Sequence, residues 1–102
     1  YLAERLDRGF RAFKDCRVNI EREPSSYLRN FYYDTVNFNQ GALMLAIDFA
    51  GADHILAGSD YPHQIGSIPS MMDAIAKLPV TEEARAGIYG LNAARLLGVP
   101  AA

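Results

Sequence analysis

An aspartate and a histidine stand close together in the stretch HILAGSDYPHQIG, which covers residues 54 to 66. Asp60 follows a short apolar run that is typical of a buried strand, and His63 follows Asp60 after a Tyr-Pro turn. A carboxylate at a strand end can bind a divalent metal, or it can take a proton from a water molecule that a metal has acidified. It can equally cap a turn, and for Asp60 the sequence favours neither interpretation.

A second aspartate, Asp34, follows the strand-like run Phe31-Tyr32-Tyr33, and there turn capping is the favoured interpretation. Functional side chains gather where parallel strands end, because loops meet at that edge while the strands hold it rigid. His63 could serve there as a ligand, a proton carrier or a hydrogen-bonded turn residue. His54 precedes its strand, at the opposite end from Asp60, so we expect a structural or exposed role for it.

Composition excludes several classes of function. The 102 residues carry 12 acidic and 10 basic side chains, a net charge of −2, without a basic patch for nucleic acid or a membrane surface. A single cysteine, Cys16, cannot form an internal disulfide, and no apolar run approaches the roughly 20 residues that span a bilayer. No nucleotide-binding, serine-hydrolase or paired-cysteine motif is present. We therefore expect a soluble, cytoplasmic protein.

Hydrophobic periodicity predicts the elements that would position these residues. Leu2, Leu6, Phe10 and Phe13 recur at helical spacing, which predicts an amphipathic helix that can cover a sheet. The expected strands are 30–36 and 52–60, and the expected helices are 1–14, 37–51, a short turn at 25–29, one after Pro69, one after Thr81 and a last turn at 93–97.

Four residues have the chemistry of helix caps, namely Asn39, Gly51, Thr81 and Asn92. Helical spacing also predicts a buried stripe after Pro69, made of Met71, Met72, Ile75 and Leu78. The order of elements is a βαβ unit with helices on each side, so the two strands should be parallel.

Two strands are too few for a stable parallel sheet, because such sheets normally continue at both edges. The chain also opens without methionine. We therefore expect a consecutive slice of a larger α/β protein, whose strand edges pair with another copy or with the missing part of the sheet.

At FYYDTV, ILAGSDYPH and LNAARLLG the chain resembles the C-terminal part of the amidohydrolase superfamily. The branch it resembles is the amidohydrolase-2 group, which includes aminocarboxymuconate-semialdehyde decarboxylase and related aromatic-acid decarboxylases. The resemblance implies the C-terminal part of a TIM (β/α)8 barrel, with residues 1–102 as one segment of a single barrel domain. That segment would run from helix 6 to the closing helices, with residues 30–36 as strand 7 and 54–60 as strand 8.

The resemblance also implies roles. Asp60 would be the strand-8 aspartate that touches a divalent metal, zinc in this branch, or its bound water. His63, Asp34 and Tyr61 would line the substrate pocket. The parent would be a hydrolase or decarboxylase that acts on a small carboxylic acid, such as an aromatic one, through metal-bound water. The histidine ligands of the family would precede residue 1, so we expect the isolated chain to bind zinc weakly and to be inactive. The alternative is a non-catalytic α/β module that self-associates through its open strand edges.

Overall fold

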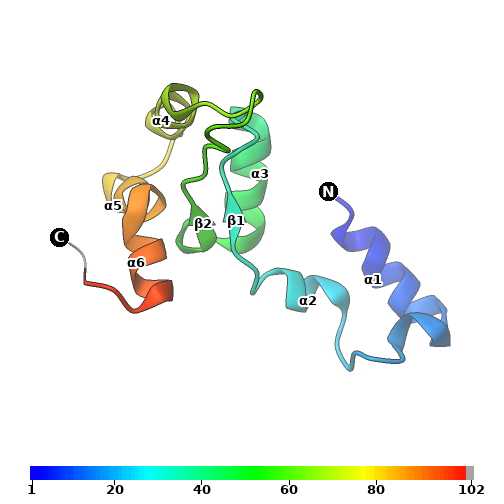
Figure 1. Cartoon of the computed structure of the whole chain (residues 1–102). Helices are drawn as coiled ribbons and strands as arrows, with labels where there is room; N and C mark the ends of the chain where they lie inside the picture. The colour runs from blue at the N-terminus through cyan, green and yellow to red at the C-terminus, as the bar shows by residue number, and fades with distance from the viewer. Residues whose placement is uncertain (101–102) are drawn as a thin grey trace. The chain divides into compact units, whose positions relative to one another are not determined.

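The computed structural model describes residues 1–100, which fall into two compact units that divide between Phe31 and Tyr32. The first unit is helical. Its elements are α1 (Ala3–Ala12), a 3-10 turn η1 (Lys14–Arg17) and α2 (Pro24–Leu28) (Figure 1). These bounds confirm the helix predicted at 1–14 and the short helical turn predicted at 25–29.

A polar contact joins α1 to α2 in this unit. Asp7 is buried on α1, and its Oδ1 accepts a hydrogen bond from the backbone N–H of Ser25 at 2.9 Å. That hydrogen bond lowers the pKa of the Asp7 carboxyl. Glu23, which precedes α2, makes no side-chain cap hydrogen bond. The Asp7 carboxylate therefore caps the start of α2 from another helix.

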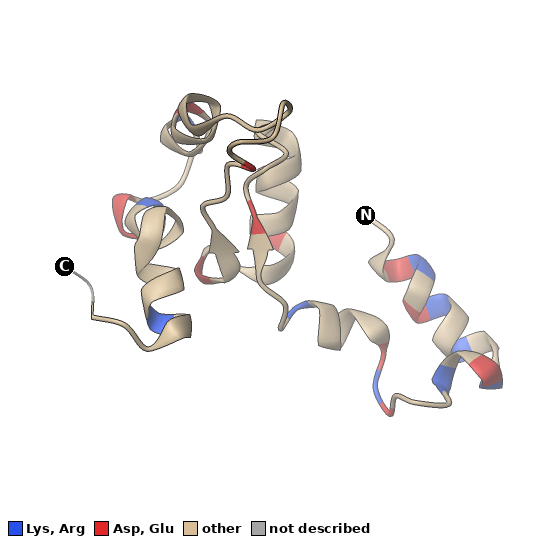
Figure 2. Cartoon of the chain, viewed as in Figure 1, with Lys and Arg blue, Asp and Glu red and all other residues tan. Residues whose placement is uncertain are grey.

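The outer surface of α1 combines charge with exposed apolar side chains. Acidic and basic residues alternate along the helix (Figure 2), while Leu2, Leu6 and Phe13 are also exposed. Phe10, the fourth residue of the predicted stripe, is half-buried, and its ring centroid lies 6.0 Å from the Arg17 guanidinium carbon.

The second unit is built around a parallel strand pair. Strand β1 (Tyr33–Asp34) pairs with β2 (Ile55–Leu56), with Tyr33 opposite Ile55 and Asp34 opposite Leu56. The helix α3 (Gln40–Ala50) connects them, which confirms the predicted parallel βαβ unit (Figure 1).

Both strands are shorter than predicted. The expected strand at 52–60 is wrong at each end, because Ala52–His54 form a 3-10 turn, η2, and the chain leaves the ladder after Leu56. Beyond Leu56 the N–H of Gly58 donates to the side-chain hydroxyl of Thr35 at 3.0 Å and not to a backbone carbonyl of β1. The strand expected at 30–36 likewise keeps two residues, Tyr33 and Asp34.

The caps of α3 agree with the sequence. Asn39 Oδ1 accepts the N–H of Ala42 at 3.0 Å, and Gly51 ends the helix with a φ of 94° while its N–H donates to Ile47.

The helix α4 (Ile68–Ala76) follows a cap by Ser67 and has Pro69 in its first turn. Its predicted buried stripe is only partly correct. Ile75 and Leu78 are buried, but Met72 is 45% exposed. Because successive helical residues lie about 100° apart, Met72 falls outside the face that Met71, Ile75 and Leu78 share.

The chain ends in one continuous helical rod. It consists of α5 (Glu82–Ala86), a π-helical segment η3 (Gly87–Leu91) and α6 (Asn92–Leu97). Thr81 caps it, as predicted, by accepting the N–H of Ala84 at 3.2 Å, and Gly98 closes it with a left-handed φ of 66°.

Asn92 does not cap a separate last turn, so that prediction is wrong. The residue has helical dihedral angles within the rod and is buried. Its side-chain amide donates to the carbonyls of Ala52 and Ile55, at 2.8 and 2.9 Å. Its Oδ1 accepts from the Arg95 guanidinium at 3.2 Å, and not from a backbone N–H at a helix start.

Helices pack on both sides of the strand pair. In Figure 1, α3 lies on one side and the C-terminal rod on the other. The buried apolar core between these elements and α4 is formed by Leu43, Ile55, Ala74, Ile75, Leu78 and Ile88. No helix within residues 1–100 is long and apolar enough to cross a membrane.

Candidate functional site

The segment from Ser59 to Ser67, here called the Asp60 loop, leads from β2 to α4 and closes on itself. The N–H of Ser67 donates to the carbonyl of Ser59 at 2.8 Å, which ties the two ends together. Inside the loop, the N–H of His63 donates to the carbonyl of Asp60 at 2.8 Å, and the N–H of Gly66 donates to His63 at 2.9 Å. The peptide bond between Tyr61 and Pro62 is cis. The loop is thus a compact turn with backbone hydrogen bonds across it.

Asp60 has a special backbone conformation in this loop. Its φ is 53°, a left-handed value that aspartate adopts more readily than most residues. The backbone of Gly66 lies directly against it. A Cβ added at Gly66 would lie 2.3 Å from the carbonyl oxygen of Asp60 and 2.7 Å from that of Ser59. Only glycine leaves room for the loop to close in this way.

The loop encloses one side of an open hollow of about 490 Å³. Its lining residues are Asp60, His63, Gln64 and Ile65. The structure therefore brings Asp60 and His63 to one hollow through the geometry of the loop. Both side chains are exposed, so each can reach a ligand.

Asp34 and Tyr61 lie outside that lining. The Asp34 carboxylate accepts the N–H of Val36 at 3.1 Å, which is the turn-capping arrangement that its sequence position favoured. Tyr61 is 69% exposed. Their assignment to a substrate pocket remains a prediction.

His54 lies at the other end of β2 from Asp60. Its ring stacks on Tyr32, with ring centroids 4.5 Å apart and planes within 8°. This contact joins the starts of the two strands and agrees with a structural role. A second hollow, of about 370 Å³, also lies at this end, and Ala52, Asp53 and Asn92 are among its lining residues. It contains none of the predicted site residues.

Two residues near the site escaped the sequence reasoning, Thr35 and Gly66. Thr35 is fully buried, and its Oγ1 makes two hydrogen bonds to the backbone of Gly58. A threonine after a strand and a glycine in a loop are too common for either signal to be specific.

Two of the predicted site residues, Asp60 and His63, have side chains that can bind a metal ion. Asp60 and His63 offer a carboxylate and an imidazole, which zinc and manganese both accept. Within residues 1–100, however, no three histidine, cysteine, aspartate or glutamate side chains are grouped so that they could hold a metal ion. Asp60 and His63 could therefore bind a metal ion only together with ligands from elsewhere.

A parallel strand pair linked by a helix is the repeating unit of a (β/α)8 barrel. The chain belongs to the amidohydrolase family, whose model matches residues 4–99.

The chain is also similar to individual proteins of known name. The chain is 26% identical over 98 residues to 2-amino-3-carboxymuconate-6-semialdehyde decarboxylase from Dictyostelium discoideum, covering 93% of this chain. It resembles the structure of a dihydroxybenzoic acid decarboxylase from a Polaromonas species with bound manganese and the inhibitor 2-nitroresorcinol, at 30% identity over 100% of the chain with a TM-score of 0.83. The 2,6-dihydroxybenzoate decarboxylase from Rhizobium is 31% identical over 96% of the chain, with a TM-score of 0.81.

The chain spans only part of each relative. It covers 27% of the Dictyostelium protein and 31% of each of the two solved structures.

Proposed function

We propose that this chain forms the C-terminal part of a metal-dependent decarboxylase that acts on an aromatic or related carboxylic acid. The observation that carries the proposal is the position of Asp60, in a closed loop after β2 and beside His63. The relatives named above support it, because each is a decarboxylase by name and two act on dihydroxybenzoic acids. A hydrolase is the second candidate, because the chain is also 26% identical to a structure from Staphylococcus aureus named as a putative amidohydrolase.

Asp60 is proposed as the catalytic carboxylate and as one ligand of a divalent metal, either zinc or manganese. Further ligands would come from protein segments outside this chain. A bound divalent ion supplies positive charge that polarises the substrate. The manganese of the Polaromonas structure supports a divalent metal in this family.

Decarboxylation breaks the bond between the substrate carbon and its carboxylate. The electron pair stays on that carbon, CO₂ leaves, and a proton takes its place. A carboxyl group at the position of Asp60 can deliver this proton. His63 and Gln64 would form one wall of the substrate site, with Asp34 and Tyr61 as more distant candidates.

The alternative, a non-catalytic module that self-associates through its strand edges, has no specific observation in its favour. Self-association of this chain and its cytoplasmic location both remain predictions.

Replacement of Asp60 by asparagine tests the proposal, because Asp60→Asn keeps the side-chain volume and removes the charge. In the full-length protein we expect CO₂ release from dihydroxybenzoic acids to fall by about 10² to 10⁴-fold. Metal content, measured by elemental analysis on the same samples, should fall too.

Asp48→Asn is the matched control, because Asp48 is an exposed aspartate on α3. That variant should keep both the rate and the metal. An Asp60→Asn protein with unchanged rate and unchanged metal content would refute the role of Asp60.

A further inference from the structure

The strand pair ends in an unusual way. After Tyr33 opposite Ile55 and Asp34 opposite Leu56, the next pair in the register would be Thr35 opposite Ala57. That pair is absent, and the N–H of Ala57 donates to the carbonyl of Ile88. The backbone ladder between the strands thus ends at Leu56, two residues before the Asp60 loop begins.

The side chain of Thr35 continues the connection. Its Oγ1 accepts the N–H of Gly58 and donates to the carbonyl of Gly58, both at 3.0 Å. A hydroxyl group can do both at once, because it has one donor and two acceptor lone pairs. One side chain thus satisfies both backbone polar groups of Gly58.

This contact is closely packed. Thr35 has 0% exposure, so water cannot replace its hydroxyl. A Cβ added at Gly58 would lie 3.0 Å from Cβ of Asp34 and 3.3 Å from Cγ1 of Val36. Gly58 is therefore held against β1 by hydrogen bonds and by the shape of its neighbours.

Gly58 lies two residues before Asp60, and the other side of the loop is fixed by the Ser59 to Ser67 hydrogen bond. The path from Thr35 to the Asp60 carboxylate thus contains a single intervening residue after Gly58. We propose that Thr35 is a positioning residue, whose hydroxyl fixes where Asp60 lies relative to the end of β1. This inference rests on the proposed role of Asp60.

Thr35→Val and Thr35→Ser, made in the full-length enzyme, test the inference. Valine keeps the branched shape and removes the hydroxyl, whereas serine keeps the hydroxyl. We expect Thr35→Val to lower kcat by about 100-fold, the loss that a displacement near 1 Å can cause. KM should change little, because the substrate-binding surface is untouched, and Thr35→Ser should restore most of kcat.

Hydrogen exchange at the Gly58 amide gives a readout besides activity. Thr35→Val removes the acceptor of that N–H, so its exchange should become faster, while Thr35→Ser should protect it nearly as well as the native residue.

Thr81→Val is the matched control for a general loss of stability. Thr81 also uses its hydroxyl to accept a backbone N–H, but it does so at the start of α5. This variant should lower thermal stability and leave kcat unchanged. Equal kcat losses in Thr35→Val and Thr81→Val would overturn the inference.

If Thr35→Val does not fold, Gly58→Ala carries the test. It displaces the same backbone without touching the hydroxyl, so the same loss of kcat is expected, and a native kcat would contradict the inference.

Asp60→Asn distinguishes failure of the positioning role of Thr35 from failure of the proposed function. If Asp60→Asn is inactive while Thr35→Val keeps native kcat, the positioning role alone fails; if Asp60→Asn is fully active, the proposed function fails first.

Discussion

Asp60 is set apart from an ordinary turn residue by what surrounds its backbone. Its left-handed φ of 53° and the carbonyl that receives the N–H of His63 fix the direction from which its side chain leaves the loop. The proximity of His63 was foreseeable, since the two residues are three positions apart. The close approach of Gly66 was not, because it depends on how the whole loop closes.

Gly66→Ala should strongly disrupt the Asp60 loop. The new methyl group would lie 2.3 Å from the Asp60 carbonyl oxygen, so the loop backbone must move. We expect a loss of about 2 kcal/mol in the free energy of unfolding, measured by urea denaturation.

Gly90→Ala is the control, because a Cβ at Gly90 meets no atom within 4 Å. Gly90 lies inside the helical rod, so alanine should be neutral or should add about 0.5 kcal/mol. Similar losses in the two variants would show that the Gly66 contact is unimportant.

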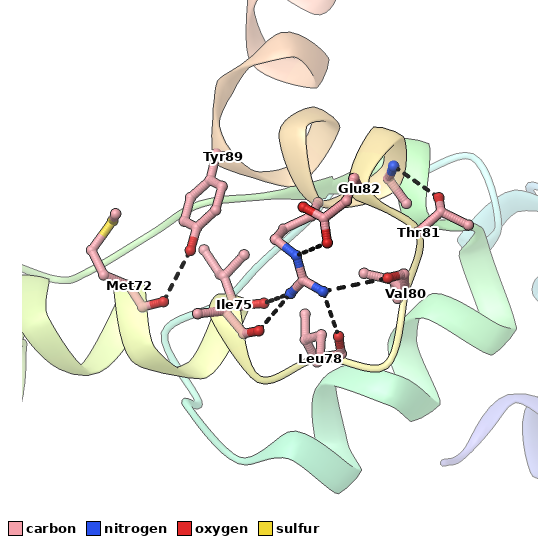
Figure 3. Close-up of polar contacts among 10 residues, drawn as sticks. Met72, Ile75, Leu78, Val80, Thr81, Glu82 and Tyr89 are labelled. Carbon is pink, nitrogen blue, oxygen red and sulfur yellow. Dashed lines mark hydrogen bonds and ion pairs between the residues drawn. The ribbon is translucent and has the colours of Figure 1, made fainter.

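Among the elements, α4 and the C-terminal rod depend on each other through Arg85. The α4 helix ends at Ala76 with carbonyls that lack helical partners. The Arg85 guanidinium donates to the carbonyls of Ile75 and Ala76, at 2.5 and 2.7 Å, and also to those of Leu78 and Val80. Figure 3 shows these carbonyls converging on one group, with Tyr89 bonded to the Met72 carbonyl nearby. One arginine thus caps α4 from a different helix.

Arg85→Lys should therefore not be conservative. Lysine keeps the positive charge, but its single ammonium group cannot match the planar fork that spans four carbonyls. Because the Arg85 side chain is only 17% exposed, we expect a loss of about 2 kcal/mol in the free energy of unfolding. Thermal or urea unfolding of the purified protein measures it.

Lys77→Met gives the comparison. Lys77 pairs with Asp73 at 2.7 Å, but both side chains are more than 60% exposed. Surface pairs of this kind contribute little, so the change should stay within about 0.5 kcal/mol. An Arg85→Lys protein as stable as Lys77→Met would contradict the capping role.

The whole chain contains a folded core and an incomplete site. Its strands have two residues each, and the core is assembled from α3, α4, β2 and the C-terminal rod. The chain covers less than a third of each relative described above. Within residues 1–100, the possible metal ligands do not form a group of three.

The 102-residue chain alone should consequently not bind zinc tightly. Two donors on an exposed loop leave half of the usual four-ligand shell to water. Isothermal titration calorimetry with zinc should show no stoichiometric binding at micromolar concentration, and Asp60→Asn should make no difference to that result. Tight binding of one zinc per chain would mean that this segment holds the metal without other parts of an enzyme.

The sequence by itself determined the features that depend on neighbouring residues. Asn39, Gly51 and Thr81 act within a few positions along the chain, so residue type and spacing were sufficient to identify these caps. Residue type and order also indicated the parallel strand pair and the family, which were confirmed.

Tertiary structure decided what depends on distant partners. Asn92 has the chemistry of a cap, but its amide bonds to carbonyls 40 and 37 positions away. The ladder ends at Leu56, and beyond it the Thr35 side chain bonds to the backbone of Gly58, 23 positions away. The hydrogen-bond partner of a side chain or N–H is the group that lies close to it in the folded chain. Local sequence pattern does not predict which distant residues come close. The sequence could therefore identify Asp60, whereas the folded structure was needed to show what holds it in place.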